Sequence, residues 1–184
     1  MRPFKAIGSV LAFGACLALV QSAGADNRKG GRDVVWARLI GLQEVPAVLT
    51  PARGWFRATI DEDARTIEYS LSYEKLEGAV TMAHLHVGQH HVNGGISVWL
   101  CGTTALPGPS GTPACPSPEG RVEGTAGVAA VVGPVVGGAP AQGFVPMTEE
   151  GFDDLVRAIR SGVVYANVHS SIAPGGEIRG QIGR

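Results

Sequence analysis

The stretch from Trp55 to Tyr73, WFRATIDEDARTIEYSLSY, decides how the rest of the chain can be understood. Apolar residues take every second position in its first half and again in its second half, with an acidic turn at 61–63 between them. These residues are Phe56, Ala58 and Ile60, then Ile67, Tyr69, Leu71 and Tyr73. A period of two is typical of a strand with one buried face, so the stretch predicts an antiparallel hairpin.

Short runs of the same kind recur along the chain and are separated by Gly, Pro and Asn. They cover residues 79–87, 96–101, 163–169 and 177–182, with a weaker candidate at 122–132. Many short strands with glycine-rich turns predict an all-β sandwich or barrel. Residues 103–147 are so rich in Pro and Gly that we expect an insertion that is mostly loop.

One segment, residues 148–162, has helical spacing instead. Its apolar residues Phe152, Leu155, Val156 and Ile159 fall at i, i+3, i+4 and i+7. Thr148 stands where an N-cap is expected, acids fill the first turn and arginines the last, and Gly162 follows as a stop. The pattern predicts one short amphipathic helix near the C-terminus that lies on the β-structure.

The N-terminus has the features of an export signal. Arg2 and Lys5 precede an uncharged apolar run, and small residues follow at 22–25. This arrangement predicts a signal peptide over residues 1–25, a disordered segment over 26–33 and one folded domain over 34–184. Acylation of Cys16, as in a lipoprotein, is the alternative. We expect the mature chain to be secreted or periplasmic and to lack a transmembrane helix.

Charge and cysteine content narrow the partners and the compartment. The chain has a net charge of −1, and losing Arg2 and Lys5 with the signal lowers it to −3, so nucleic acid is not an expected partner. Cys101 and Cys115 remain after processing. An even count in an exported chain predicts a disulfide between them, and two free thiols are the alternative.

Three further blocks carry a family resemblance. They are GLQEVP at 41–46, AHLHVG at 83–88, and YANVH at 165–169 followed by GGEIRGQI at 175–182. In order and spacing they resemble the CHRD (chordin) domain. The resemblance implies an antiparallel immunoglobulin-like β-sandwich or barrel found in extracellular proteins, among them chordin, which binds growth factors. The Pro/Gly-rich insertion and the pair His90 and His91 depart from the family pattern.

The histidines are the residues best suited to chemistry. His84 and His86 are two residues apart on a predicted strand, so both rings project to one face. His169 would be a third ligand if its strand lies beside theirs, and His90 and His91 are weaker candidates. Neutral imidazole suits copper or zinc, so either ion is a potential cofactor. The alternative is that His84, His86 and His169 hydrogen-bond to backbone carbonyls or to Glu177 and hold the last strands in register.

The resemblance and the absence of a catalytic motif favour a binding module over an enzyme. We expect it to bind an unidentified extracytoplasmic protein or ligand; a periplasmic copper- or zinc-binding protein is the alternative. The HxH strand is loosely similar to the copper-binding strand of superoxide dismutase, but no zinc loop matches, so that activity is not expected. Glu177, Arg179 and Gln181 share one face of a strand and could form a recognition surface.

Overall fold

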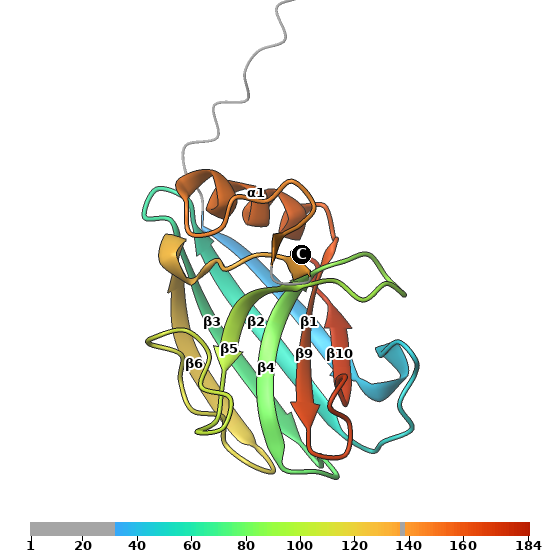
Figure 1. Cartoon of the computed structure of the whole chain (residues 1–184). Helices are drawn as coiled ribbons and strands as arrows, with labels where there is room; N and C mark the ends of the chain where they lie inside the picture. Colours follow the sequence, from blue (N-terminus) through green and yellow to red (C-terminus); the bar gives the residue numbers. More distant parts are fainter. Residues whose placement is uncertain (1–31, 137–138) are drawn as a thin grey trace, which may run out of the picture.

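The structure is a computed structural model that describes residues 32–136 and 139–184. Its main sheet has eight strands in the order β5-β4-β9-β10-β1-β2-β3-β6, and every neighbouring pair is antiparallel. The strands are β1 (Asp33–Ile40), β2 (Arg53–Asp61), β3 (Thr66–Glu74), β4 (Val80–Val87), β5 (Ile96–Cys101), β6 (Gly120–Gly127), β9 (Val164–Ser170) and β10 (Ile178–Gln181). Figure 1 shows them wrapping around a common axis. The all-β prediction is confirmed.

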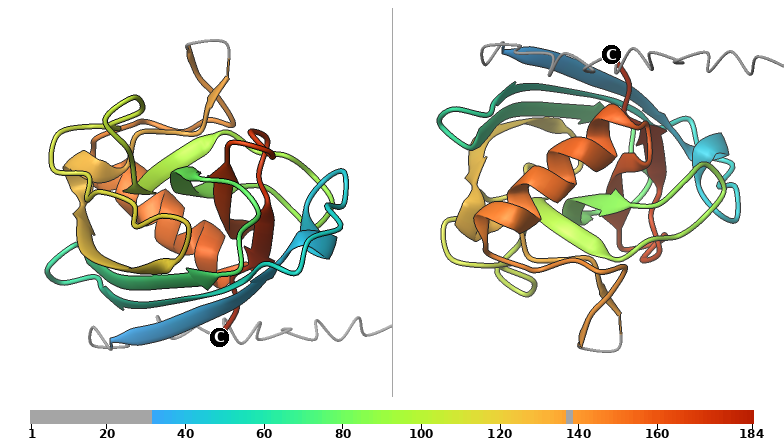
Figure 2. Two further views of the ribbon diagram at one scale, coloured as in Figure 1. Left: turned by 90° about the horizontal axis from the view of Figure 1, so that it is seen from below. Right: turned by 90° about the horizontal axis from the view of Figure 1, so that it is seen from above.

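The sheet is a nearly closed barrel. Its two end strands, β5 and β6, face each other across the remaining opening (Figure 2). The Tyr69 hydroxyl on β3 donates a hydrogen bond of 2.8 Å to the Leu100 carbonyl on β5, and Val98 forms an isolated bridge with Val131. These contacts connect the two edges of the sheet across the opening.

The predicted hairpin is present as β2 and β3. β2 and β3 pair along their whole length, from Arg53 opposite Glu74 to Asp61 opposite Thr66. The alternate apolar positions all face the barrel interior and are at most 7% exposed. Their burial is the reason that the period-two pattern was so strong in the sequence.

The helix α1 (Glu149–Arg160) covers one end of the barrel (Figures 1 and 2). The Thr148 hydroxyl accepts a 3.1 Å hydrogen bond from the Gly151 amide, which confirms the predicted N-cap. The four residues of its apolar stripe are buried. Arg160 in the last turn forms ion pairs with Asp33 and Glu62, and so fixes the helix to the start of β1 and the end of β2.

The insertion at 103–147 contains more β-structure than its composition indicated. β6 pairs with β3 over eight positions despite three glycines, so the weak strand expected at 122–132 is an integral strand that begins at Gly120. A short hairpin of β7 (Val135–Val136) and β8 (Ala139–Pro140) follows. The described residues also contain two 3₁₀ turns, η1 (Gly41–Gln43) and η2 (Val128–Ala130).

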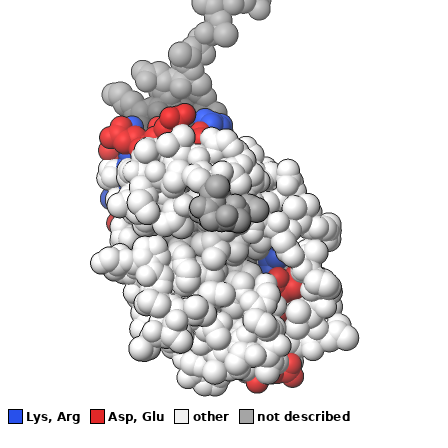
Figure 3. Space-filling view, viewed as in Figure 1, with Lys and Arg blue, Asp and Glu red and all other residues white. Residues whose placement is uncertain are grey.

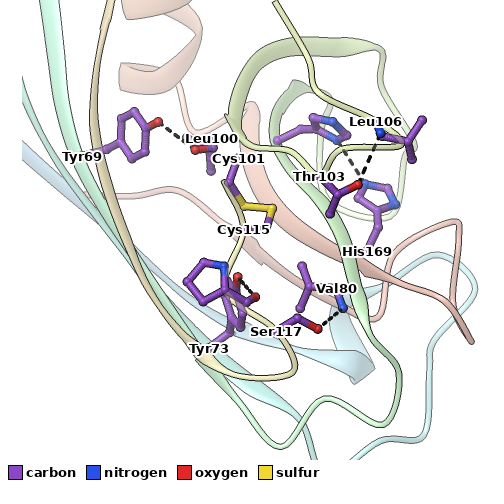
Figure 4. Close-up of a disulfide and its surroundings, with 12 residues drawn as sticks. Tyr69, Tyr73, Val80, Leu100, Cys101, Thr103, Leu106, Cys115, Ser117 and His169 are labelled. Atoms are coloured by element: carbon purple, nitrogen blue, oxygen red, sulfur yellow. Dashed lines mark hydrogen bonds between the residues drawn. A yellow bond between two sulfur atoms is a disulfide. The ribbon is translucent and has the colours of Figure 1, made fainter. Parts of the chain in front are cut away.

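A disulfide joins Cys101 at the end of β5 to Cys115, as the cysteine count predicted. Figure 4 shows this disulfide and the hydrogen bonds around it. Nearby, the Tyr73 hydroxyl donates to the Pro116 carbonyl and the Val80 amide donates to the Ser117 hydroxyl. The first part of the insertion is therefore anchored to both β3 and β4.

Some expectations concern residues that the structure does not describe. The signal peptide at 1–25, the Cys16 alternative and nearly all of the segment at 26–33 lie outside the described residues and stay predictions; Asp33 is the first residue of β1. In the part of the chain that is described, no helix is both long and apolar enough to span a membrane.

Candidate functional site

The site lies on the outer face of β4, β9 and β10. Side chains alternate along these strands, so Leu85, Ala166 and Val168 point into the barrel while His84 and Asn167 point away from it. Loops nevertheless cover this outer face. His84 is 0% exposed and Asn167 is 2% exposed, which makes the outer layer as buried as the core.

The register of β4 against β9 brings the predicted histidines together. His84 lies opposite Asn167, and Met82 lies opposite His169. Nδ1 of His84 is 3.2 Å from Nε2 of His169. The Asn167 Oδ1 atom is 3.0 Å from Nε2 of His86 and 3.1 Å from Nε2 of His169. One nitrogen from each of the three rings lies within 4.8 Å of the others, so the strand adjacency required for a shared metal site is present.

Backbone carbonyls fix two of the three imidazoles. Nδ1 of His86 is 3.0 Å from the Gly94 carbonyl, and Nδ1 of His169 is 2.9 Å from the Pro174 carbonyl. A carbonyl oxygen only accepts hydrogen bonds, so both Nδ1 atoms carry a proton. In each neutral ring the lone pair is then on Nε2, the atom that faces Asn167.

All three imidazoles are held in the neutral form. Burial, with the neighbouring His169 and His86, lowers the pKa of His84 to about 2. Burial likewise lowers the pKa of His86 to about 4, against the opposing hydrogen bonds to Gly94 and Asn167. The pKa of His169 is also lowered by burial. Neutral rings at pH 7 have the protonation state that a metal ligand requires.

A second group of side chains extends the polar layer across β9 and β10. The Tyr165 ring stacks on His86, with centroids 4.8 Å apart, and the Arg179 guanidinium lies 3.4 Å from the Tyr165 ring centre. Arg179 also donates a 2.9 Å hydrogen bond to the Gln89 carbonyl. Burial raises the pKa of the Glu44 carboxyl to about 7, and the nearby Arg179 charge counteracts part of that effect.

The expected recognition trio is not exposed at the surface. Glu177 and Arg179 are 0% and 2% exposed. The Glu177 carboxylate accepts hydrogen bonds of 2.9 Å from the Thr50 hydroxyl and the Glu77 amide, while the Gln181 amide donates to the Gly88 and Gly162 carbonyls. These side chains join loops to the barrel because the loops fold over the last strand. Glu177 and Arg179 are therefore closed to a partner, while Gln181 is half-buried.

The two remaining histidines stay apart from the cluster. His90 and His91 are exposed on the loop after β4, and their ring centroids are 6.1 Å from each other. The same loop contributes the Gly94 carbonyl to His86. Its contribution to the cluster is thus made through the backbone and not through its histidines.

Asn167, Glu44 and Trp99 belong to the site but were missed as site residues from sequence. Asn167 shares a strand face with His169, two residues away, and that spacing was the one available signal. The Trp99 ring packs perpendicular to His84 with centroids 4.3 Å apart.

A pocket of about 260 Å³ lies beside Trp99. It is lined by Tyr69, Pro109, Thr112 and neighbouring residues of the insertion and β6, and its lining contains no histidine or carboxylate.

Comparison with known proteins agrees with the motifs. A family model described as the CHRD domain matches residues 35–182, which include β2 to β10 and almost all of β1. Neither the curated proteins nor the solved structures provide a match. Because the match extends over nearly the whole described chain, this protein belongs to the CHRD domain family.

Proposed function

We propose that this chain is a non-catalytic binding domain that acts outside the cytoplasm by docking an acidic surface of a protein partner. One contrast in exposure supports this function. The side chains with catalytic potential, such as His84 and Glu177, are closed beneath loops, whereas large aromatic side chains are open to solvent on the opposite wall of the barrel. The CHRD domain and the Cys101–Cys115 disulfide are consistent with an extracellular setting.

The exposed wall consists of β1 and β2, on the side of the barrel away from β4 and β5 (Figure 2). Trp36 and Trp55 are 56% and 45% exposed. Trp36 lies opposite Arg57, and Arg38 lies opposite Trp55, so the two tryptophans and two arginines alternate on the two strands. Tryptophan and arginine are the residues most enriched among energetic hot spots of protein interfaces.

We call the surface formed by Trp36, Arg38, Trp55 and Arg57 the Trp/Arg surface. Its charges indicate the kind of partner. Within residues 32–136 and 139–184, no carboxylate lies at ion-pair distance from Arg38 or Arg57. Arg53 pairs with Glu74 and lies 5.9 Å over the Trp55 ring, so it is already engaged. Two guanidinium groups beside two flat aromatic rings favour a partner that supplies carboxylates and an apolar centre. By contrast, the face over β4 and β5 bears few charges (Figure 3).

The test compares two double variants on the same wall. A partner cross-linked to the native protein in its own host is purified, and its Kd is measured for Trp36→Ala/Trp55→Ala and for Thr59→Ala/Ser70→Ala. We expect the tryptophan variant to weaken binding about 30-fold or more, because hot-spot truncations cost about 2 kcal/mol. The control should stay within about 2-fold. Equal Kd values in all three proteins, or a substrate turnover lost in His84→Ala, would refute the proposal.

A further inference from the structure

We propose that His84, His86 and His169, together with the Asn167 side-chain oxygen, form a closed site for one zinc or copper ion. This inference goes beyond partner binding, because the site lies on the outer face of β4 and β9 while the Trp/Arg surface lies on β1 and β2. A metal ion bound here would stabilise the fold. Binding of the ion would require no protein partner.

Two of the three rings in the cluster carry their protons on Nδ1. The Gly94 and Pro174 carbonyls accept hydrogen bonds from the Nδ1 N–H groups of His86 and His169. A lone pair is therefore left on each Nε2. Both Nε2 atoms face Oδ1 of Asn167, at 3.0 and 3.1 Å. An amide oxygen is also an acceptor. Three acceptor atoms therefore converge, and that arrangement repels unless a cation or a donor hydrogen lies among them.

In the observed orientation the Asn167 amide presents its oxygen to two of the histidines. A Cβ atom on Gly176 would lie 2.4 Å from Oε1 of Glu44 and 2.8 Å from Nδ2 of Asn167, so these two atoms border the same point. Oε1 of Glu44 is buried without a hydrogen-bond partner. An amide oxygen in this orientation suits a cation among the Nε2 atoms.

His84 provides the third nitrogen. Its Nε2 is buried with no hydrogen-bond partner, and the Trp99 ring lies perpendicular to the His84 ring with centroids 4.3 Å apart. An N–H beside an aromatic ring is a weak favourable contact. Placing the His84 proton on Nε2 frees Nδ1, which lies 3.2 Å from Nε2 of His169. Ligands about 2.0 to 2.1 Å from a tetrahedral ion are about 3.3 Å apart, close to this separation.

The surroundings resemble those of a structural metal site. Metal-binding histidines usually donate their second ring N–H to a carbonyl or carboxylate, as His86 and His169 do here. All four donor residues are at most 6% exposed, so no position is left open for a substrate. The Gly94 and Pro174 carbonyls come from two different loops. An ion bound to these rings would therefore tie both loops to the barrel.

The first experiment uses the purified protein without a histidine tag, stripped with a chelator and supplied with Zn²⁺, Cu⁺ or, as a control, Mg²⁺. We expect one zinc or copper ion per chain by elemental analysis and a rise in Tm of several degrees, with no response to Mg²⁺. Less than about 0.1 ion per chain with an unchanged Tm in both zinc and copper would overturn the site.

Two variants separate coordination from a structural role. His90→Ala/His91→Ala is the matched control and should bind the ion as the native chain does, since those rings are exposed and outside the cluster. Asn167→Asp keeps the size of the side chain and adds a negative ligand, so its zinc affinity should rise about 10-fold or more. Binding that is lost in the His90/His91 variant, or that falls in Asn167→Asp, would contradict the proposal. Neither result bears on the Trp/Arg surface.

Discussion

The two faces of β4, β9 and β10 are equally buried but are stabilised in different ways. On the inner face, Leu85, Ala166 and Val168 pack into an apolar core that depends on shape and volume. On the outer face, the polar side chains of His86 and His169 are fixed by hydrogen bonds to loop carbonyls. Apolar packing tolerates substitutions that conserve volume, whereas a polar layer requires each donor and acceptor to keep its partner. The outer face therefore specifies the positions of loops that the inner face cannot control.

The largest effect is expected from the inner face. Leu85→Ala should lower the free energy of unfolding by about 3 kcal/mol, because it removes buried methyl groups and leaves a cavity. Leu85→Met is the control and should cost less than about 1.5 kcal/mol. Urea denaturation of the three proteins measures both values. Equal losses of unfolding free energy in the two variants would show that stability at position 85 does not depend on side-chain volume.

A smaller, pH-dependent effect should appear on the outer face at Glu44. Burial raises the pKa of its carboxyl from 4.5 to about 7, so the folded state binds the proton more tightly than the unfolded state. The resulting stability is complete below pH 4.5 and is lost as the pH rises through 7. At pH 8, Glu44→Gln should thus be more stable than the native protein by about 2 kcal/mol, and the gap should close by pH 4.5.

Chemical denaturation of both Glu44 proteins across this pH range, in the presence of a chelator, provides the check. Titrations of other groups cancel in the difference between the two curves. A difference that stays constant from pH 4.5 to 8 would mean that the carboxyl is not affected by its burial.

The smallest effect tests geometry within the polar layer. Arg179→Lys keeps the positive charge but loses the flat guanidinium that lies over Tyr165, so we expect a cost of about 1 kcal/mol. Arg53→Lys is matched to it, because Arg53 lies over Trp55 at the surface, at 5.9 Å, and should cost less than about 0.5 kcal/mol. Thermal unfolding of both variants measures the contrast. Equal losses would show that the buried stack contributes no more than an exposed one.

Local patterns were enough to predict the elements that alternate strongly. The hairpin of β2 and β3, the N-capped helix and the Cys101–Cys115 disulfide were all predicted and are present. β6 was the weakest prediction, because its glycines hide the period of two and its pairing with β3 is a contact between distant segments. Gly180 permits the close approach of β10 to β1, because a Cβ atom there would lie 2.4 Å from the Arg38 carbonyl oxygen.

The candidate site was predicted only in part. The HxH spacing placed His84 and His86 on one face, and that follows from strand geometry alone. Whether His169 would join them depended on β4 lying beside β9, which the spacing along the chain does not determine. Glu44 could not be foreseen, since it lies 123 positions away from Asn167 in a block that gave no sign of burial.

The sequence by itself determined the β-class, the helix and the family, because each depends on a repeat or motif that can be recognised within a short window. Only the tertiary structure decided that the sheet closes into a barrel and that loops bury the outer face of β4, β9 and β10. Closure and burial depend on which distant segments meet. For the same reason Glu177 and Arg179, which share a polar strand face in the sequence, are internal supports of the fold instead of a recognition surface.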